Sequence, residues 1–258
     1  IDLYKKAVLT EGDKILSETA DYSLQPQASF ILMDPHSGEV LALSGGRGEK
    51  KQSLTLNRAS NVLRQPGSTF KILTVAAALR NGKADPNTEV DAPETITLPD
   101  TNHSLSNYAG ESCGNGKVTL AYAFAESCNT PFAQLAMDVG DKDLSSEAET
   151  WGFGEAESIP LDVTPSTYPD NESQADTAMA GIGQASVRAT PLMMAQVAET
   201  IANNGKQMKP YLVSRTLDSD LKVVSKTSPK EARTPISSET ADTLSSLMQQ
   251  AVSEGTGT

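Results

Sequence analysis

The sequence predicts a mixed chain of class α/β (α+β), in which a short β-hairpin is followed by several capped helices. Two short apolar runs, residues 28–33 and 39–43, flank the turn-forming segment 34–38, and this order of run, turn and run is typical of a hairpin. Before it, residues 5–19 have apolar side chains at mixed helical spacing, which predicts a helix. After it, an apolar run rich in helix formers begins near Ser68 and predicts a further helix.

The remaining elements are predicted from apolar spacing, cap residues and breakers. Asn81-Gly82 ends the helix that begins near Ser68. The stretch 85–116 is rich in Pro, Asn, Thr, Ser and Gly, which predicts a long surface loop. Thr190 and Pro191 suit the cap and the first turn of a helix. The other expected elements are helices over 117–125, 131–139, 143–151, 191–203 and 237–253, and strands over 211–213 and 221–224.

Length, composition and charge restrict the class of protein. The chain has 258 residues, of which 38% are hydrophobic and 21% charged, and such a chain can bury a sizeable core. The net charge of −12 and the lack of a basic run argue against nucleic acid or an anionic membrane surface as a partner. The sequence contains no apolar run of bilayer length, and we expect no signal peptide within it. Because Ile1 is not an initiator Met, we expect the chain to be cut from a longer protein.

The cysteines and histidines give little sign of a metal or redox site. Cys113 and Cys128 are the only cysteines; they either pair in an oxidising compartment or remain two thiols, and the sequence leaves both open. His36 and His103 lie far apart, and no cluster has metal-ligand spacing. His103 lies in a polar stretch, so we expect a solvated loop histidine. No metal and no cofactor is expected.

Ser68 and Lys71 form the first candidate catalytic pair. Pro66-Gly67 interrupts the chain just before a helix, so Ser68 should lie in or near the first helical turn. Lys71 comes three residues later and projects from the same face. A lysine buried against an apolar wall loses its proton more easily and can activate a serine hydroxyl. The alternative is that Ser68 only caps the helix and that the Lys71 ammonium reaches solvent.

Ser127-Cys128-Asn129 forms the second candidate motif, in a break between two predicted helices. Taken alone, Ser127 and Asn129 could equally be helix caps. The two motifs in this order, each at its expected element, resemble those of penicillin-binding transpeptidases and serine β-lactamases. That group has S-x-x-K, S-D-N and K-T-G as its signature motifs.

Further segments extend the resemblance over nearly the whole chain. Its first third is similar to class A, bifunctional penicillin-binding proteins, and the rest is similar to class B, single-function ones. The class A segments are 57–59 and 64–71, and the class B segments are 107–114, 181–184, 189–195 and 202–205. The resemblance implies a penicillin-binding transpeptidase or β-lactamase-like fold. In that fold an antiparallel sheet is flanked by helices, and an all-α lobe carries the S-x-x-K and S-x-N motifs.

The third signature motif, K-T-G, does not occur in the 258 residues. In the family a Gly-Thr-Gly similar to residues 255–257 follows the last helix, and the strand with K-T-G comes shortly after it. We therefore expect residues 1–258 to form one transpeptidase domain that is incomplete at its C-terminus, lacks the C-terminal strands and is impaired as an enzyme. Lys226-Thr227-Ser228 is a poor substitute, because it lacks the Gly and precedes the last helix.

The resemblance implies a peptidoglycan D,D-transpeptidase that works through a serine acyl-enzyme. Ser68 would be the nucleophile and Lys71 its base. Ser127 would relay a proton to the leaving group, and Asn129 would hydrogen-bond the substrate amide and Lys71. The resemblance also assigns substrate binding to Gly67, Thr69, Cys128 and Thr130.

The expected partners are peptidoglycan stem peptides and β-lactam antibiotics, with cell-division or elongation proteins as further candidates. The expected location is the extracytoplasmic face of the cell membrane, with an anchor N-terminal to this sequence. Three alternatives remain. A serine β-lactamase would need a base for deacylation, and Glu155 and Glu157 are the candidates. A β-lactam-sensing domain would share both motifs, and in a non-catalytic interaction module both motifs would be plain caps.

Overall fold

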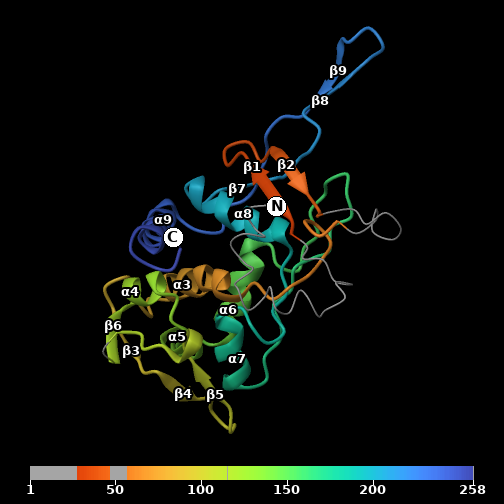
Figure 1. Cartoon of the computed structure of the whole chain (residues 1–258). Coiled ribbons are helices and arrows are strands. Elements are labelled where there is room, and N and C mark those ends of the chain that lie inside the picture. The colour runs from red at the N-terminus through yellow and green to blue at the C-terminus, as the bar shows by residue number, and fades with distance from the viewer. Residues whose placement is uncertain (1–27, 47–56, 115, 258) are drawn as a thin grey trace, which may run out of the picture.

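The computed structural model of the chain describes residues 28–46, 57–114 and 116–257 (Figure 1). The helix predicted over residues 5–19 lies outside them. Within the described residues, no helix is both long and apolar enough to cross a membrane. The helices there are η1 (Gly67–Phe70), α3 (Lys71–Arg80), η2 (Tyr108–Gly110), α4 (Leu120–Ala125), α5 (Asn129–Val139), α6 (Asp141–Trp151), α7 (Gln174–Gly181), α8 (Pro191–Ala202) and α9 (Ser238–Ser253). The strands there are β1 (Phe30–Met33), β2 (Val40–Ser44), β3 (Glu89–Ala92), β4 (Thr95–Thr97), β5 (Ser104–Ser106), β6 (Gly116–Thr119), β7 (Gln207–Met208), β8 (Arg215–Leu217), β9 (Val223–Lys226) and β10 (Glu231–Arg233).

Helix α3 runs through the middle of the molecule (Figure 1). It packs against α5, α6, α7 and α9. Helix α8 packs against both α9 and strand β1. The strand pairs β3–β6 and β4–β5 lie at the far end of the helical part, and the β1–β2 hairpin lies on the opposite side of α3. Most of the α3 side chains are buried, among them Leu73, Val75 and Ala76. The core is therefore built around the helix that follows Ser68.

The predicted hairpin is confirmed by β1 and β2, which pair antiparallel with Phe30 opposite Ser44. Asp34 closes the turn, because its Oδ1 accepts hydrogen bonds from the backbone N–H (2.8 Å) and the hydroxyl (2.7 Å) of Ser37. This is the side-chain turn that Asp favours. Glu39 and Tyr211 form a parallel bridge beside the hairpin.

The prediction of a long loop over 85–116 is wrong. This stretch contains β3, β4 and β5, and β4 pairs with β5 through Ile96 and Leu105. Strand β3 pairs with β6, which places Ala92 opposite Gly116. These strands are short, and β3 pairs with a strand at the other end of the stretch. The local sequence pattern therefore did not predict them.

The helix predicted over 117–125 begins later, at Leu120. The residues before it, 116–119, pair with β3 as strand β6. Thr119 then caps α4, because its hydroxyl accepts a hydrogen bond from the Tyr122 N–H (3.2 Å). Val118 and Thr119 are β-branched and therefore weak helix formers, which is consistent with their pairing in a strand.

The predicted cap of α8 is confirmed, and α9 has a cap of the same kind. Thr190 accepts a hydrogen bond from the Met193 N–H (3.1 Å), and Pro191 is the first residue of α8. Ser237 caps α9 in the same way through the Thr240 N–H (3.1 Å). These hydroxyls satisfy backbone donors that the first helical turn leaves unpaired.

The two strands predicted over 211–213 and 221–224 are displaced toward the C-terminus and form β8 and β9. This hairpin projects away from the body of the molecule (Figure 1). Lys226 ends β9 with an exposed side chain. The sequence Lys226-Thr227-Ser228 thus lies on the projecting arm, apart from the helices that carry the two motifs.

Candidate active site

Ser68 lies in the 3₁₀ turn η1, which leads directly into α3. Gly67 before it has a φ of 57°, a left-handed conformation that glycine adopts at low cost. Side chains three residues apart eclipse one another in a 3₁₀ turn, so Ser68 and Lys71 project to the same side. Ser68 is exposed, whereas Lys71 is only 1% exposed. The prediction that Ser68 lies at a helix start is confirmed, and the alternative that Lys71 reaches solvent is wrong.

The Lys71 ammonium is held by neutral oxygens. Its Nζ donates to the Ser127 carbonyl (2.7 Å), to Asn129 Oδ1 (3.0 Å) and, at greater length, to Ser127 Oγ (3.4 Å). The centroid of the Phe132 ring lies 5.2 Å from Nζ. Among the described residues, no carboxylate lies within ion-pair distance of Lys71. Burial therefore acts without an opposing charge and lowers the pKa of Lys71 to about 7.

Ser127 occupies a tight connection between α4 and α5. Its φ of 54° is unusual for a residue with a side chain and indicates local strain. This conformation points both its carbonyl and its hydroxyl toward Lys71. Asn129 begins α5, and its Nδ2 donates to the Ser106 carbonyl (3.2 Å). Since an amide NH₂ carries two donors, one is left for a ligand.

Asn107 is a part of the site that the sequence did not assign. Its Oδ1 accepts hydrogen bonds from the N–H groups of Asn129 (2.8 Å) and Thr130 (3.1 Å), the first two residues of α5. It therefore caps α5 from a segment 22 residues earlier, which the formal cap residue Cys128 does not do. Asn is a good cap residue, but its partner at this separation has no local signal. Asn107 thus fixes the start of the helix whose first side chain contacts Lys71.

Cys113 and Cys128 form a disulfide, which decides the question that the sequence left open. Thr130 is fully buried, and its hydroxyl donates to the Pro93 carbonyl (2.6 Å). Thr69 is exposed and donates to the Pro66 carbonyl (2.6 Å). The assignment of Gly67, Thr69, Cys128 and Thr130 to substrate binding stays a prediction, and each of the four has a structural contact of its own.

The two glutamates considered for deacylation have other partners. Glu155 accepts a hydrogen bond from Arg233 (2.8 Å), which keeps the pKa of Glu155 low. Glu157 accepts from the side chain of Gln196 (2.9 Å). Neither contact involves Lys71 or the Ser127–Asn129 turn.

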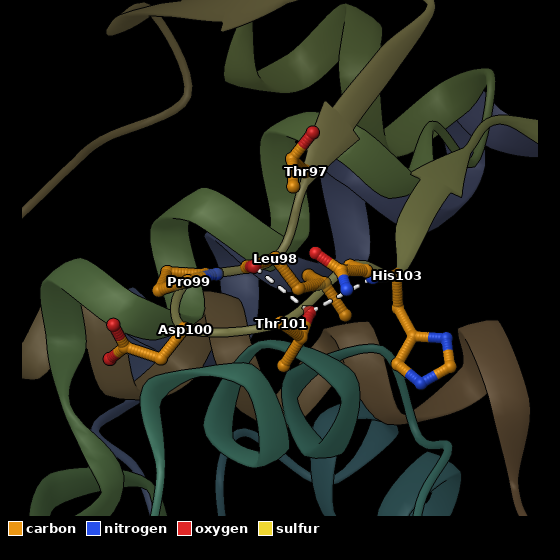
Figure 2. A pocket seen from close by; sticks show the side chains of 7 residues that line it. Thr97, Leu98, Pro99, Asp100, Thr101 and His103 are labelled. Atoms are coloured by element: carbon orange, nitrogen blue, oxygen red, sulfur yellow. Dashed lines mark hydrogen bonds between the residues drawn. The ribbon is translucent and has the colours of Figure 1, made fainter.

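His103 lies in the polar turn between β4 and β5, as Figure 2 shows. The Thr101 hydroxyl donates to the Leu98 carbonyl (3.0 Å) and accepts from the His103 N–H (3.1 Å). Residues 97–103 alone line the hollow beside it. The imidazole points outward and is exposed, so the prediction of a solvated loop histidine is confirmed.

The exposed Ser68, the buried Lys71 three residues later, and Ser127 and Asn129 in contact with that lysine form the pattern of a serine acyltransferase of the penicillin-reactive kind. The chain belongs to this family: the penicillin binding protein transpeptidase domain matches residues 28–258. Among the similar curated proteins, peptidoglycan D,D-transpeptidase PbpA of Mycolicibacterium smegmatis is 43% identical over 246 residues, which cover 86% of this chain and 50% of that protein. PbpA of Mycobacterium tuberculosis is 39% identical, and the match covers 91% of this chain and 48% of that protein. The chain thus spans about half the length of the curated relatives it matches.

Solved structures agree with the fold. The crystal structure of PBPA from M. tuberculosis is 34% identical, with a TM-score of 0.84 over 88% of this chain and 57% of that one. Its imipenem acyl-enzyme complex has a TM-score of 0.83, at 34% identity, with 87% and 57% covered. The D,D-transpeptidase domain of a peptidoglycan glycosyltransferase from Eggerthella lenta has a TM-score of 0.84 at 29% identity. The match covers 95% of this chain and 66% of that one. The predicted penicillin-binding, β-lactamase-like α/β fold is confirmed.

Proposed function

We propose that this chain is the acyl-transferring part of a peptidoglycan D,D-transpeptidase, with Ser68 as nucleophile. One observation carries the proposal: the buried Lys71 ammonium has only neutral oxygen partners among the described residues, and its pKa lies near 7. A lysine in this state is a proton acceptor at neutral pH. The printed names of the PbpA relatives support peptidoglycan as the substrate class.

In the proposed acylation, the Ser68 hydroxyl gives its proton to neutral Lys71 while Oγ bonds to the carbonyl carbon between two terminal D-alanines. The C–N bond of the tetrahedral intermediate then breaks. The leaving amine takes a proton that passes from the Lys71 ammonium through the Ser127 hydroxyl, which lies 3.4 Å from Nζ. The product is an ester on Ser68. An amine of a second stem peptide attacks this ester, forms the cross-link and frees Ser68.

The neighbouring groups fit the remaining needs of this reaction. The free donor of the Asn129 amide is suited to a substrate carbonyl. The Ser68 N–H, in the first turn of η1, has no helical acceptor and is suited to hold the developing oxyanion. β-Lactams carry a reactive amide of the same kind, and the imipenem complex of the M. tuberculosis relative is described as an acyl-enzyme. We therefore include β-lactams among the ligands of this chain.

The test is covalent labelling of the full-length protein with a fluorescent penicillin. Ser68→Ala should abolish the label, and Ser104→Ala, which removes another exposed hydroxyl, should leave it unchanged. Both variants should keep the melting temperature of the wild type. Undiminished labelling of Ser68→Ala would contradict the assignment of the nucleophile.

The same assay separates the transpeptidase from a β-lactamase. Hydrolysis of the ester needs a base that activates water, and the candidates Glu155 and Glu157 are engaged by Arg233 and Gln196. We therefore expect the label to persist after free penicillin is removed. Rapid loss of label would favour a β-lactamase.

The Cys113–Cys128 disulfide supports a location outside the cytoplasm, because structural disulfides persist in oxidising compartments. We propose that the site faces the cell wall. The test is thiol alkylation of the native protein taken directly from cells. Unmodified cysteines support the proposal, and two rapidly alkylated thiols would contradict it.

A further inference from the structure

The end of α7 lies against both elements that carry the candidate catalytic residues (Figure 1). We propose that Gly181 and Gly183 are positioning residues, which set the distance between the Ser68–Lys71 element and the Ser127–Asn129 element. The proposal rests on the proposed function, because it concerns the same acylation. The atoms nearest to a Cβ added at either glycine belong to Gly67, Ala136 and Thr74 and not to Lys71, so both glycines act through packing.

Gly183 packs backbone against backbone on Gly67. The Gly67 N–H donates to the Gly183 carbonyl (3.0 Å), and a Cβ atom added at Gly183 would lie 2.1 Å from the Gly67 oxygen and 2.7 Å from its nitrogen. Any side chain there would push the Gly67 backbone away. Because Ser68 follows Gly67 directly, such a shift moves the nucleophile.

Gly181 contacts the two helices at the same point. The Thr74 hydroxyl on α3, one turn after Lys71, donates to the Gly181 carbonyl (2.6 Å). A Cβ atom added at Gly181 would lie 2.2 Å from the Cβ of Ala136 on α5. The next nearest atoms would lie at ordinary contact distances of 3.5 and 3.7 Å. The missing side chain at Gly181 is therefore what lets α7 approach α5 while it holds α3.

The contact with the nucleophile turn continues along the chain. Arg64 and Ala189 exchange both backbone hydrogen bonds (3.0 and 2.8 Å). Gln65 Nε2 donates to the Ala185 carbonyl (2.6 Å). Together with the Gly67–Gly183 bond, these contacts align the approach to Ser68 with residues 183–189. Residues 183–189 thus hold Arg64, Gln65 and Gly67, the segment that leads to Ser68.

The Lys71 contacts depend on this alignment. Lys71 belongs to α3, whereas its acceptors on Ser127 and Asn129, at 2.7 and 3.0 Å, lie just before and at the start of α5. A shift of about 1 Å between catalytic groups costs roughly 100-fold in rate. We therefore expect a side chain at either glycine to slow acylation by one to two orders of magnitude, about 10- to 100-fold.

The experiment uses alanine variants of the full-length protein and measures the second-order rate of acylation by a fluorescent penicillin, together with the melting temperature. Gly183→Ala combines a left-handed φ of 70° with a backbone clash. Its matched control is Gly82→Ala, where φ is 61° but no atom lies within 4 Å of the added Cβ. Gly82→Ala carries the same conformational strain, so it should lose stability and keep the wild-type acylation rate.

Gly181→Ala allows a rescue, because its clash is with a single Cβ atom. Replacing Ala136 by Gly in the same chain removes that atom. The double variant Gly181→Ala/Ala136→Gly should regain most of the acylation rate, although glycine within α5 lowers the melting temperature. A merely structural role predicts instead that the folded fraction of Gly181→Ala is acylated at the wild-type rate and that only its melting temperature falls.

The outcomes are distinct. Slow acylation of Gly183→Ala and Gly181→Ala, with rescue of the latter, supports the proposal. Wild-type rates in both single variants, or a double variant slower than Gly181→Ala, would overturn it. If Gly183→Ala does not fold, the Gly181 and Ala136 variants decide the question alone. A wild-type protein that takes no label at all would contradict the proposed function instead.

Discussion

The two ends of helix α3 each carry a basic side chain, and the two are held in opposite ways. Lys71 at the first turn has neutral oxygen acceptors, and burial lowers its pKa to about 7. Arg80 at the last turn donates its Nε–H to Glu147 Oε2 (2.6 Å), and this bond raises the pKa of Arg80. One helix therefore holds a cation that can lose its proton and a cation that cannot.

The difference follows from a carboxylate. Glu147 is 2% exposed and also accepts from the Trp151 indole N–H (2.8 Å). Its charge needs a partner, and Arg80 supplies one. At the other end, the described residues offer Lys71 only carbonyl, amide and hydroxyl oxygens. These neutral dipoles orient the Lys71 amine but supply no negative charge to stabilise its protonated form. Lys71 can therefore act as a proton acceptor.

The largest expected effect comes from Lys71→Arg. Arginine keeps the charge and much of the stem, but it does not lose its proton in proteins. We expect the rate of acylation by a fluorescent penicillin to fall by about 10²- to 10⁴-fold, the usual contribution of a general base. The melting temperature, measured on the same samples, serves as the control for folding. A rate within a few-fold of the wild type would mean that another group is the base.

The sequence predicted this end of α3 well and the other end poorly. Pro66-Gly67, the spacing from Ser68 to Lys71 and the Ser127–Asn129 turn are local patterns, and each lies where it was expected. Glu147 gave no such signal, because its contact with Arg80 spans 67 residues. Asn107 was missed for the same reason, since it caps α5 across 22 residues.

The strand errors have a related cause. Residues 117–119 are compatible with a helix, and pairing with β3 places them in β6 instead. The loop expected over 85–116 also contains the local hairpin of β4 and β5, whose three-residue strands are too short to show a clear alternation. Helix caps such as Thr190 act within three residues and were predicted correctly. Helix caps could thus be predicted from the sequence, whereas the distant pairing of β3 with β6 and the very short strands β4 and β5 could not.

The next effect concerns stability at the Arg80 end. Arg80→Met leaves the Glu147 carboxylate buried without its cation, so we expect the free energy of unfolding to fall by about 2–3 kcal/mol. Glu147→Gln is the matched variant. It leaves only the half-exposed Arg80, which water can solvate, and should cost about 1 kcal/mol.

Urea unfolding of the full-length protein checks this prediction. The acylation rate of the folded fraction should stay near that of the wild type in both variants. Equal costs for Arg80→Met and Glu147→Gln would contradict the view that Glu147 is the group that needs the pair.

A smaller effect is expected from pH. With a Lys71 pKa of about 7, the neutral fraction rises about tenfold between pH 6 and pH 8. The acylation rate of the wild type should rise by the same factor and level off above that range. Between about pH 7 and 10.5, Lys71 is largely neutral in the folded chain and largely protonated in the unfolded chain. The contribution of Lys71 to the free energy of unfolding should therefore rise with pH over that window. A rate that is flat between pH 6 and 8 would contradict the assignment.

The central claim is that Lys71 is close to half neutral at physiological pH. The direct measurement is an NMR titration of the full-length protein with ¹³C at the lysine Cε atoms, in which the Lys71 signal is assigned by its absence from Lys71→Arg. We predict a titration midpoint of about 7, well separated from the exposed lysines. A midpoint at the ordinary lysine value of about 10.5 would contradict it.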